Sequence, residues 1–178
     1  TGVQTCALPI SIYPQAKVTH RLDMATSGLL IFAKHRDAEV AMSKLFQARQ
    51  VTKHYIALVQ GQIPPQGSVD VPLITDWPNR PKQMVSFEHG KTAKTLFERI
   101  NYNAETNISR VKLTPITGRS HQLRVHMQYL GHPMIGDTLY ASSEQQQLMP
   151  RLCLHAASLS FHHPQTEELV QFDCPVPF

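Results

Sequence analysis

The sequence lacks most of the features that mark secreted, membrane-spanning or metal-stabilised proteins. Its 178 residues include three cysteines, Cys6, Cys153 and Cys174, an odd number with no CxxC spacing, so neither a disulfide framework nor a zinc site is indicated. No apolar run is long enough to cross a bilayer, and the first residues lack the basic and apolar segments of a signal peptide. These absences predict a cytoplasmic protein with no membrane partner and no metal.

Acidic residues are also few. The chain has 13 Asp and Glu against 17 Lys and Arg, which gives a formal net charge of +4 at pH 7. Positive charge favours an anionic partner such as RNA, although many basic proteins bind no nucleic acid. The hydrophobic content of 42% is ordinary for a globular protein, and the length suits one domain with a substantial core.

The spacing of apolar residues predicts an α+β domain with a mostly antiparallel sheet and flanking helices. Strands are expected at 27–35, 53–61, 93–102, 108–116, 155–163 and 168–174. Helices are expected at 37–50, with Asp37 as N-cap, and at 118–131, closed by Gly131. The segment 62–83 is rich in Pro and turn residues and is expected to be a long loop inserted on one face.

The stretch HRLDMATSG, residues 20–28, places a lone carboxylate, Asp23, before a flexible turn. Considered alone, Asp23 is a turn or cap residue, but an ionised and desolvated carboxylate can also act as a covalent nucleophile. The pair His121 and His126 has i, i+5 spacing and no HExxH pattern, so we expect packing or hydrogen bonding rather than metal binding. Leu123 and Val125 are expected in the core.

Four separated blocks resemble, in order and spacing, the RluA family of RNA pseudouridine synthases. They are HRLDMATSGLLIFAK, KHYIALVQG, PITGRSHQLRVHMQYLGHPMIGDTLYA and RLCLHAASLSFHHP. The resemblance runs from about Tyr13 to Phe178. It implies a pseudouridine synthase fold and an isomerase that needs no cofactor, acting as a monomer on uridine in a stem-loop of 23S ribosomal RNA, of a transfer RNA anticodon arm, or of both, with no DNA partner.

The resemblance also assigns roles to three residues. It makes Asp23 the nucleophile and Arg119 the guanidinium that pairs with this carboxylate and keeps it ionised. Tyr55 is implied to lie against the target base, for stacking and for proton transfer. Whether Asp23 attacks the sugar, attacks the base or acts through an elimination stays open, because all three routes would use the same residues.

Further residues are expected to contact the RNA. The target base must leave its stack, and Arg21 is the candidate to fill the gap. His20 either contacts a phosphate or shapes the turn. Basic side chains on or just after the Pro-rich segment are expected to follow the phosphate backbone: Arg80, Lys82, Lys91 and Lys94.

Two other classes of protein were weighed. One is a catalytically impaired RNA-binding fragment of the same fold, which the presence of Asp23, Tyr55 and Arg119 disfavours. The other is a hydrolase using Asp23 with a histidine, which would need a second carboxylate or an activated Ser or Cys nucleophile. No such group of residues is visible in the sequence.

The first residues do not fit the family pattern. Members of the family carry a strand and a Lys-Pro loop before the HRLD block, whereas residues 1–12 read TGVQTCALPISI. We therefore expect an unrelated, poorly packed tail at residues 1–12 and an N-terminally truncated catalytic domain at 13–178. A sheet without its terminal strand exposes unpaired backbone groups, so the chain is predicted to be less stable and less active than an extended version.

Overall fold

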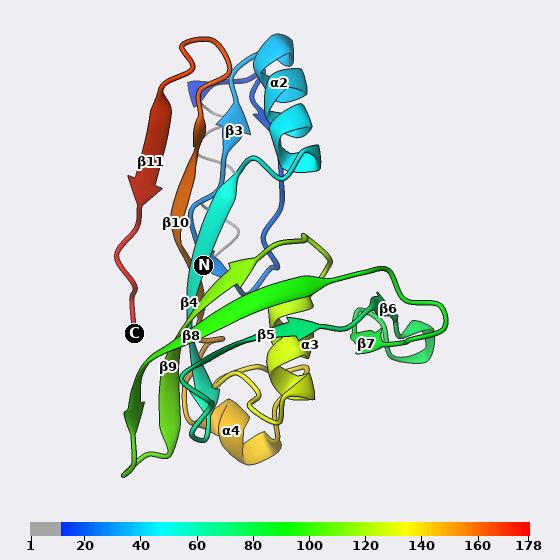
Figure 1. The fold of residues 1–178 in the computed structure, drawn as a ribbon, viewed down its shortest axis with the longest axis vertical. Coiled ribbons are helices and arrows are strands. Elements are labelled where there is room, and N and C mark those ends of the chain that lie inside the picture. Colours follow the sequence, from blue (N-terminus) through cyan, green and yellow to red (C-terminus); the bar gives the residue numbers. More distant parts are fainter. Residues whose placement is uncertain (1–11) are drawn as a thin grey trace.

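The computed structural model describes residues 12–178, and the prediction for residues 1–11 lies outside this range. Its centre is a seven-stranded sheet in the order β11-β10-β4-β9-β8-β5, with β2 joined to β10 (Figure 1). All the pairings are antiparallel except that of β2 with β10. The strands are β2 (Ser27–Gly28), β4 (Thr52–Gln60), β5 (Gln66–Asp70), β8 (Lys94–Asn103), β9 (Ile108–Pro115), β10 (Leu154–His162) and β11 (Leu169–Asp173). The mostly antiparallel α+β fold is confirmed.

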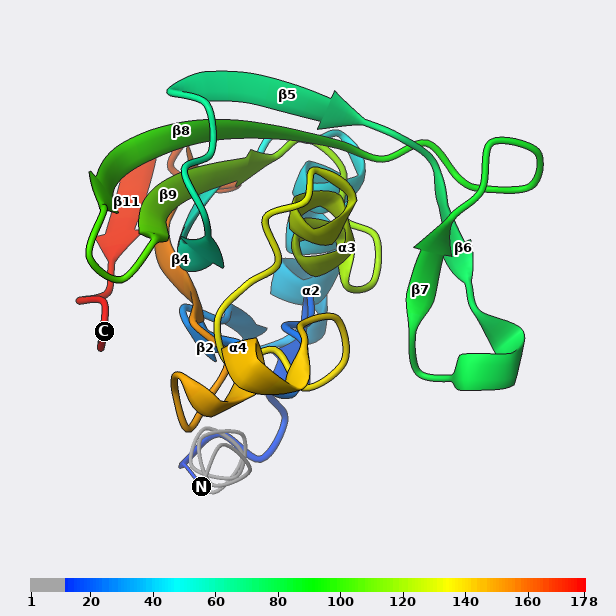
Figure 2. The same cartoon turned by 90° about the horizontal axis from the view of Figure 1, so that it is seen from below.

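A small hairpin extends away from this sheet. It consists of β6 (Leu73–Thr75), the 3-10 turn η1 (Trp77–Asn79) and β7 (Gln83–Val85), and it stands apart from the body of the molecule in both views (Figures 1 and 2). The prediction of a long loop at 62–83 is therefore wrong. The prolines that suggested it lie between the strands, and the short apolar stretches around Val69 and Leu73 pair and are buried.

The predicted strand at 27–35 is two short strands. The first, β2, pairs with β10, and the second, β3 (Phe32–Ala33), pairs with β1 (Lys17–Val18). After Gly28 the chain stops pairing with β10 and goes on to pair with β1. Gly28 has a φ of 110°, and a Cβ there would lie 2.3 Å from the Ala156 carbonyl oxygen. Only glycine fits this close approach, which an apolar pattern does not reveal.

Helix α2 (Arg36–Gln47) agrees with the expected helix except at its start. His35 is the N-cap and its side chain accepts a hydrogen bond from the Ala38 amide, so Asp37 is a first-turn residue and its predicted capping role is wrong. Helix α4 (Ser143–Gln147) begins with a capping box at Ser142. None of the helices in the described part of the chain is long and apolar enough to span a membrane.

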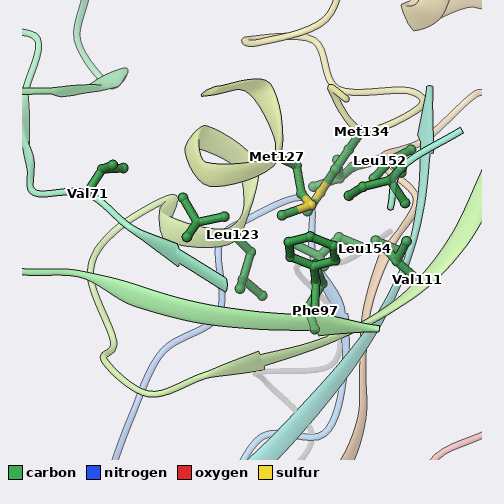
Figure 3. Close-up of a cluster of buried hydrophobic side chains, with 13 residues drawn as sticks. Val71, Phe97, Val111, Leu123, Met127, Met134, Leu152 and Leu154 are labelled. Carbon is green, nitrogen blue, oxygen red and sulfur yellow. The ribbon is translucent and has the colours of Figure 1, made fainter. Parts of the chain in front are cut away.

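Helix α3 (Gln122–Tyr129) packs on the concave face of the sheet and forms the centre of the core (Figure 2). It ends as predicted at Gly131, whose φ is 80°. Leu123 and Met127 of α3 meet strand residues such as Phe97 and Leu154 (Figure 3). Val125 packs with Leu73, Ala93 and Tyr140. The predicted core roles of Leu123 and Val125 are confirmed, and the helix joins the sheet to the base of the hairpin.

Candidate active site

A pocket of about 610 Å³ opens between the loop that carries Asp23, the ends of β4 and β9, and the start of α3. Of the described residues that line it, Asp23 is the only carboxylate. Four others are cationic: Arg21, Arg49, Lys53 and Arg119. Such a lining suits an anionic ligand, and the volume is in the range of small-ligand sites.

Hydrogen bonds fix the Asp23 loop at both ends. The Thr26 amide donates to the Asp23 carbonyl at 2.9 Å, which closes the turn, and the Ser27 hydroxyl lies 2.8 Å from His155 Nδ1 on β10. On the other side, the Ile31 amide donates to His20 Nε2 at 3.0 Å. Burial, together with the nearby charge of Lys53, lowers the pKa of His20 to about 4. His20 is thus a neutral acceptor that shapes the turn, and a phosphate contact by this residue stays a prediction.

The guanidinium beside Asp23 belongs to Arg124, not to Arg119. Arg124 Nη1 lies 3.8 Å from Asp23 Oδ2, whereas the exposed Arg119 donates from Nε to the Thr92 carbonyl at 3.1 Å. The predicted pairing of Arg119 with Asp23 is therefore wrong. Arg119 still lines the pocket, and a catalytic role for it stays a prediction.

The start of α3 explains this difference. Gln122 Oε1 accepts hydrogen bonds from the Arg119 amide at 3.0 Å and from the Thr117 hydroxyl at 2.6 Å, which holds residues 117–121 in a turn. Arg119 lies in this turn, while Arg124 lies on the buried face of the helix that follows. The signal in the sequence is a charged residue between Leu123 and Val125, both of which are core residues.

Asp137, which sequence reasoning missed, holds Arg124 in place. Arg124 donates from Nε and Nη2 to the two carboxylate oxygens of Asp137 at 2.8 and 2.6 Å. The Asp137 side chain is 0% exposed, and its Oδ1 also accepts from the amides of Leu139 and Tyr140. Burial opposes the charge of Arg124, but Asp137 and Asp23 outweigh this effect and raise its pKa. A permanent positive charge therefore lies behind Asp23.

Tyr55 on β4 lines the same pocket. Burial, with a smaller effect of the Asp23 charge, raises the pKa of its phenol to about 12. Near neutral pH the hydroxyl is protonated and able to donate. The structure thus brings together five of the predicted site residues: His20, Arg21, Asp23, Tyr55 and Arg119.

The other predicted residues lie outside the pocket. Arg80 is exposed and its Cζ lies 4.5 Å from the centre of the Trp77 ring, at the tip of the β6–β7 hairpin. Lys82 directly precedes β7, and Lys91 lies between β7 and β8, where it forms an isolated bridge with Leu73 of β6. Lys94 is on β8 and forms an ion pair with Asp70 at 3.1 Å, so its charge is partly neutralised.

Both histidines of α3 make hydrogen bonds, as predicted. The buried His126 contacts the Thr95 hydroxyl through Nδ1 and the Val71 carbonyl through Nε2. His121 Nδ1 lies 2.7 Å from the Tyr140 hydroxyl.

Solved structures share this fold. One titled "Human RNA Pseudouridylate Synthase Domain Containing 1" matches with a TM-score of 0.84 and 31% identity, over 98% of this chain and 74% of that chain. One titled "Human RNA Pseudouridylate Synthase Domain Containing 4" has a TM-score of 0.76 and 24% identity, over 96% and 77%. The fold is that of pseudouridylate synthase domains, with the cation-lined pocket on the concave side of the sheet.

Sequence comparison defines the family. A sequence model described as "RNA pseudouridylate synthase" matches residues 4–129, a range that begins within the segment expected to differ from the family. Proteins named "Dual-specificity RNA pseudouridine synthase RluA" are 51% identical in Pasteurella multocida and 52% identical in Escherichia coli K12, over 93% of this chain and 76% of theirs. The chain belongs to the RluA family of RNA pseudouridine synthases.

Proposed function

We propose that this RNA pseudouridine synthase acts on uridine in hairpin loops of ribosomal RNA, transfer RNA or both, with Asp23 as its nucleophile. One observation carries the role of Asp23: it is the only carboxylate among the described residues of the pocket, and the buried Arg124 lies behind it. The RluA relatives are named "dual-specificity" synthases, which supports more than one RNA substrate.

The reaction is an isomerisation, in which the bond from N1 of uracil to C1′ of ribose breaks and a bond from C5 to C1′ forms. The proton of C5 is lost and N1 gains one, so no atom is added overall. The positive charge of Arg124, 3.8 Å from Asp23 Oδ2, orients this carboxylate for attack at the sugar or at the base. Tyr55, protonated beside Asp23, serves as a stacking surface and as a carrier of protons between uracil positions.

The target nucleotide reaches Asp23 only when it is extruded from its loop. Arg21 is exposed at the mouth of the pocket, two residues before Asp23, where its planar guanidinium fills the space that the base leaves. Arg49, Lys53 and Arg119 surround the pocket and bind the flanking phosphates. Outside the pocket, the hairpin presents Arg80 and Lys82 to the stem, together with Lys91, which is bridged to Leu73 of β6.

The test of the nucleophile is Asp23→Asn. This nearly isosteric change removes the charged oxygen, so pseudouridine formation in a stem-loop RNA falls below about 1% of wild type while RNA affinity stays within a few-fold. Asp173→Asn is the matched control, because among the described residues this exposed carboxylate on β11 accepts hydrogen bonds from Gln171 alone. Turnover of Asp23→Asn above that level contradicts the covalent role.

Incubation of total RNA from a strain lacking the enzyme, followed by pseudouridine mapping, tests the substrate. Modified uridines in hairpin loops of both ribosomal and transfer RNA are expected. Modification of duplex regions only would contradict the proposal. RNA binding by the wild-type chain without any pseudouridine would instead favour a catalytically impaired fragment.

A further inference from the structure

We infer that Tyr140 is a positioning residue that couples the β6–β7 hairpin to the groups behind Asp23. The inference rests on the proposed role of Asp23. Tyr140 is 7% exposed and does not line the pocket, so it acts only through its neighbours.

The hydroxyl of Tyr140 joins two parts of the molecule that are distant in sequence. The amide of Gln83 on β7 donates to this oxygen at 2.8 Å, and His121 Nδ1 lies 2.7 Å from it. His121 lines the pocket, and its ring stands edge-on to that of Tyr140, with centroids 5.6 Å apart. A single oxygen atom thus connects the hairpin backbone with the pocket wall.

The rest of Tyr140 contacts the support of Asp23. Its amide donates to Asp137 Oδ1 at 3.2 Å, and the Cζ of Arg124 lies 5.0 Å from the centre of its ring. Asp137 and Arg124 form a buried ion pair through Nε and Nη2 of Arg124, and the third nitrogen, Nη1, lies 3.8 Å from Asp23 Oδ2. A shift of Tyr140 therefore moves Arg124 as well as His121.

Counting donors and acceptors assigns the protons. The Tyr140 hydroxyl accepts from Gln83 and has one proton to give. Burial, with smaller effects of the Asp137 and Asp23 charges, raises the pKa of the phenol to about 12, so the phenol is neutral. If His121 Nδ1 accepts the hydroxyl proton, both the hydroxyl and Nδ1 have a partner, and the imidazole carries its own proton on Nε2. With Nδ1 as donor, the hydroxyl proton would have no partner among the described residues.

The residues around Tyr140 are also packed closely enough for a movement of the hairpin to reach the ring. The Tyr140 ring belongs to a buried cluster with Leu73 of β6 and Val125 of α3, against which Val85 of β7 packs. Residues of both hairpin strands therefore pack in the same cluster as the ring. When RNA binds the hairpin, the strands, the ring and Arg124 are displaced or fixed together, which links recognition to the geometry of the nucleophile.

The test is Tyr140→Phe, which removes the hydroxyl and keeps the ring. The matched control is Tyr102→Phe, which also removes a hydrogen-bonded phenol hydroxyl, here bonded to Asn107 Oδ1 at 2.9 Å on the far part of β8. Tyr140→Phe removes the contacts to both Gln83 and His121, and we expect it to lower the single-turnover rate at saturating RNA about three- to tenfold, with the dissociation constant within twofold. The Gln83 amide should exchange its hydrogen faster, and Tyr102→Phe should change neither quantity.

A double-mutant cycle with His121→Asn gives an independent readout. Because both residues act through one contact, the rate of the double variant should be close to that of the slower single variant. Tyr140→Phe with an unchanged rate or unchanged Gln83 exchange overturns the inference, as does an effect that multiplies with that of His121→Asn. An active Asp23→Asn would refute the proposed nucleophile instead, so the two failures are distinguishable.

Discussion

An arginine lies beside an aromatic ring both behind Asp23 and on the β6–β7 hairpin, but the first pair is buried and the second is exposed to solvent. The Arg124 side chain is 4% exposed and is held by a carboxylate that is 0% exposed. On the hairpin, Trp77 is 64% exposed and the Arg80 guanidinium lies over its ring in solvent. An arginine that is part of the core contributes to folding and, in the proposed reaction, to catalysis at once, while an exposed arginine is accessible to a partner.

This comparison gives a rule for substitutions. Near Arg124, loss of one charge leaves another buried without compensation, so stability and activity fall together. On the hairpin, loss of a charge leaves the folded state almost unaffected and alters only binding. The predictions below test this separation.

The largest effect is expected for Arg124→Met. It leaves Asp137 buried and unpaired, so the free energy of unfolding should fall by about 3–5 kcal/mol, and activity should be lost because Asp23 loses its counter-charge. Chemical denaturation and single-turnover assays measure the two quantities. Arg119→Met is the matched control, with an expected change in stability below about 0.5 kcal/mol since this side chain is exposed. Equal destabilisation by both changes would contradict the separation.

The second prediction concerns the hairpin. Changing Arg80, Lys82 and Lys91 to Ala together should weaken RNA binding about tenfold at moderate salt and reduce the slope of log K against log salt by about 2, as expected for three lost phosphate contacts. The melting temperature should be almost unchanged. Lys94→Ala should have a smaller effect than any of the three, because Asp70 already neutralises Lys94. An unaltered salt slope in the triple variant would place the RNA elsewhere.

The third prediction concerns acid. His20 has a folded pKa of about 4 and an ordinary value of 6.5, so between these values the unfolded chain binds a proton that the folded chain does not. Its contribution to stability is present above pH 6.5 and is lost as the pH falls toward 4. The expected loss is about 2 kcal/mol, reduced from the full shift by partial exposure. His20→Gln retains an acceptor for the Ile31 amide without titrating, so it should flatten this slope in denaturation at several pH values.

The slope should not vanish in that variant. Burial also lowers the pKa of His126 and of His155, so both contribute in the same direction. An equally steep acid slope in His20→Gln would mean that His20 protonates without unfolding the loop.

The fold was largely predictable because its main strands have clear alternation. The pair β8 and β9 and the tail strands β10 and β11 follow their apolar patterns to within a residue or two. The segment 62–83 was misjudged because its strands are short and separated by prolines. Strand β5 depends on pairing with β8, and β7 depends on the hydrogen bond from Gln83 to Tyr140. Both partners are distant in the sequence.

Residues that line the pocket could be predicted from the sequence, but the buried residues that hold them, Arg124, Asp137 and Tyr140, could not. Asp23 and Tyr55 were found through the family blocks, and the pocket contains both. The resemblance led to Arg119, and Arg124 in the same block was not considered, because only the start of α3 at Gln122 decides which of the two faces inward. Asp137 and Tyr140 carry no local pattern, since their importance comes from contacts across 13 residues or more.

The smallest effect is expected at Thr26, where the loop of Asp23 meets the pocket. Its hydroxyl oxygen is buried and has no hydrogen-bond partner among the described residues. Thr26→Val replaces this oxygen with a methyl group of similar size and removes an unsatisfied polar group, so the protein should gain about 1 kcal/mol of stability. This corresponds to a rise of about 2–4 °C in melting temperature for a chain of this size. A lower melting temperature would show that the hydroxyl has a partner, such as an ordered water. Unchanged activity alongside the gain would show that the Thr26 hydroxyl is not needed to position Asp23.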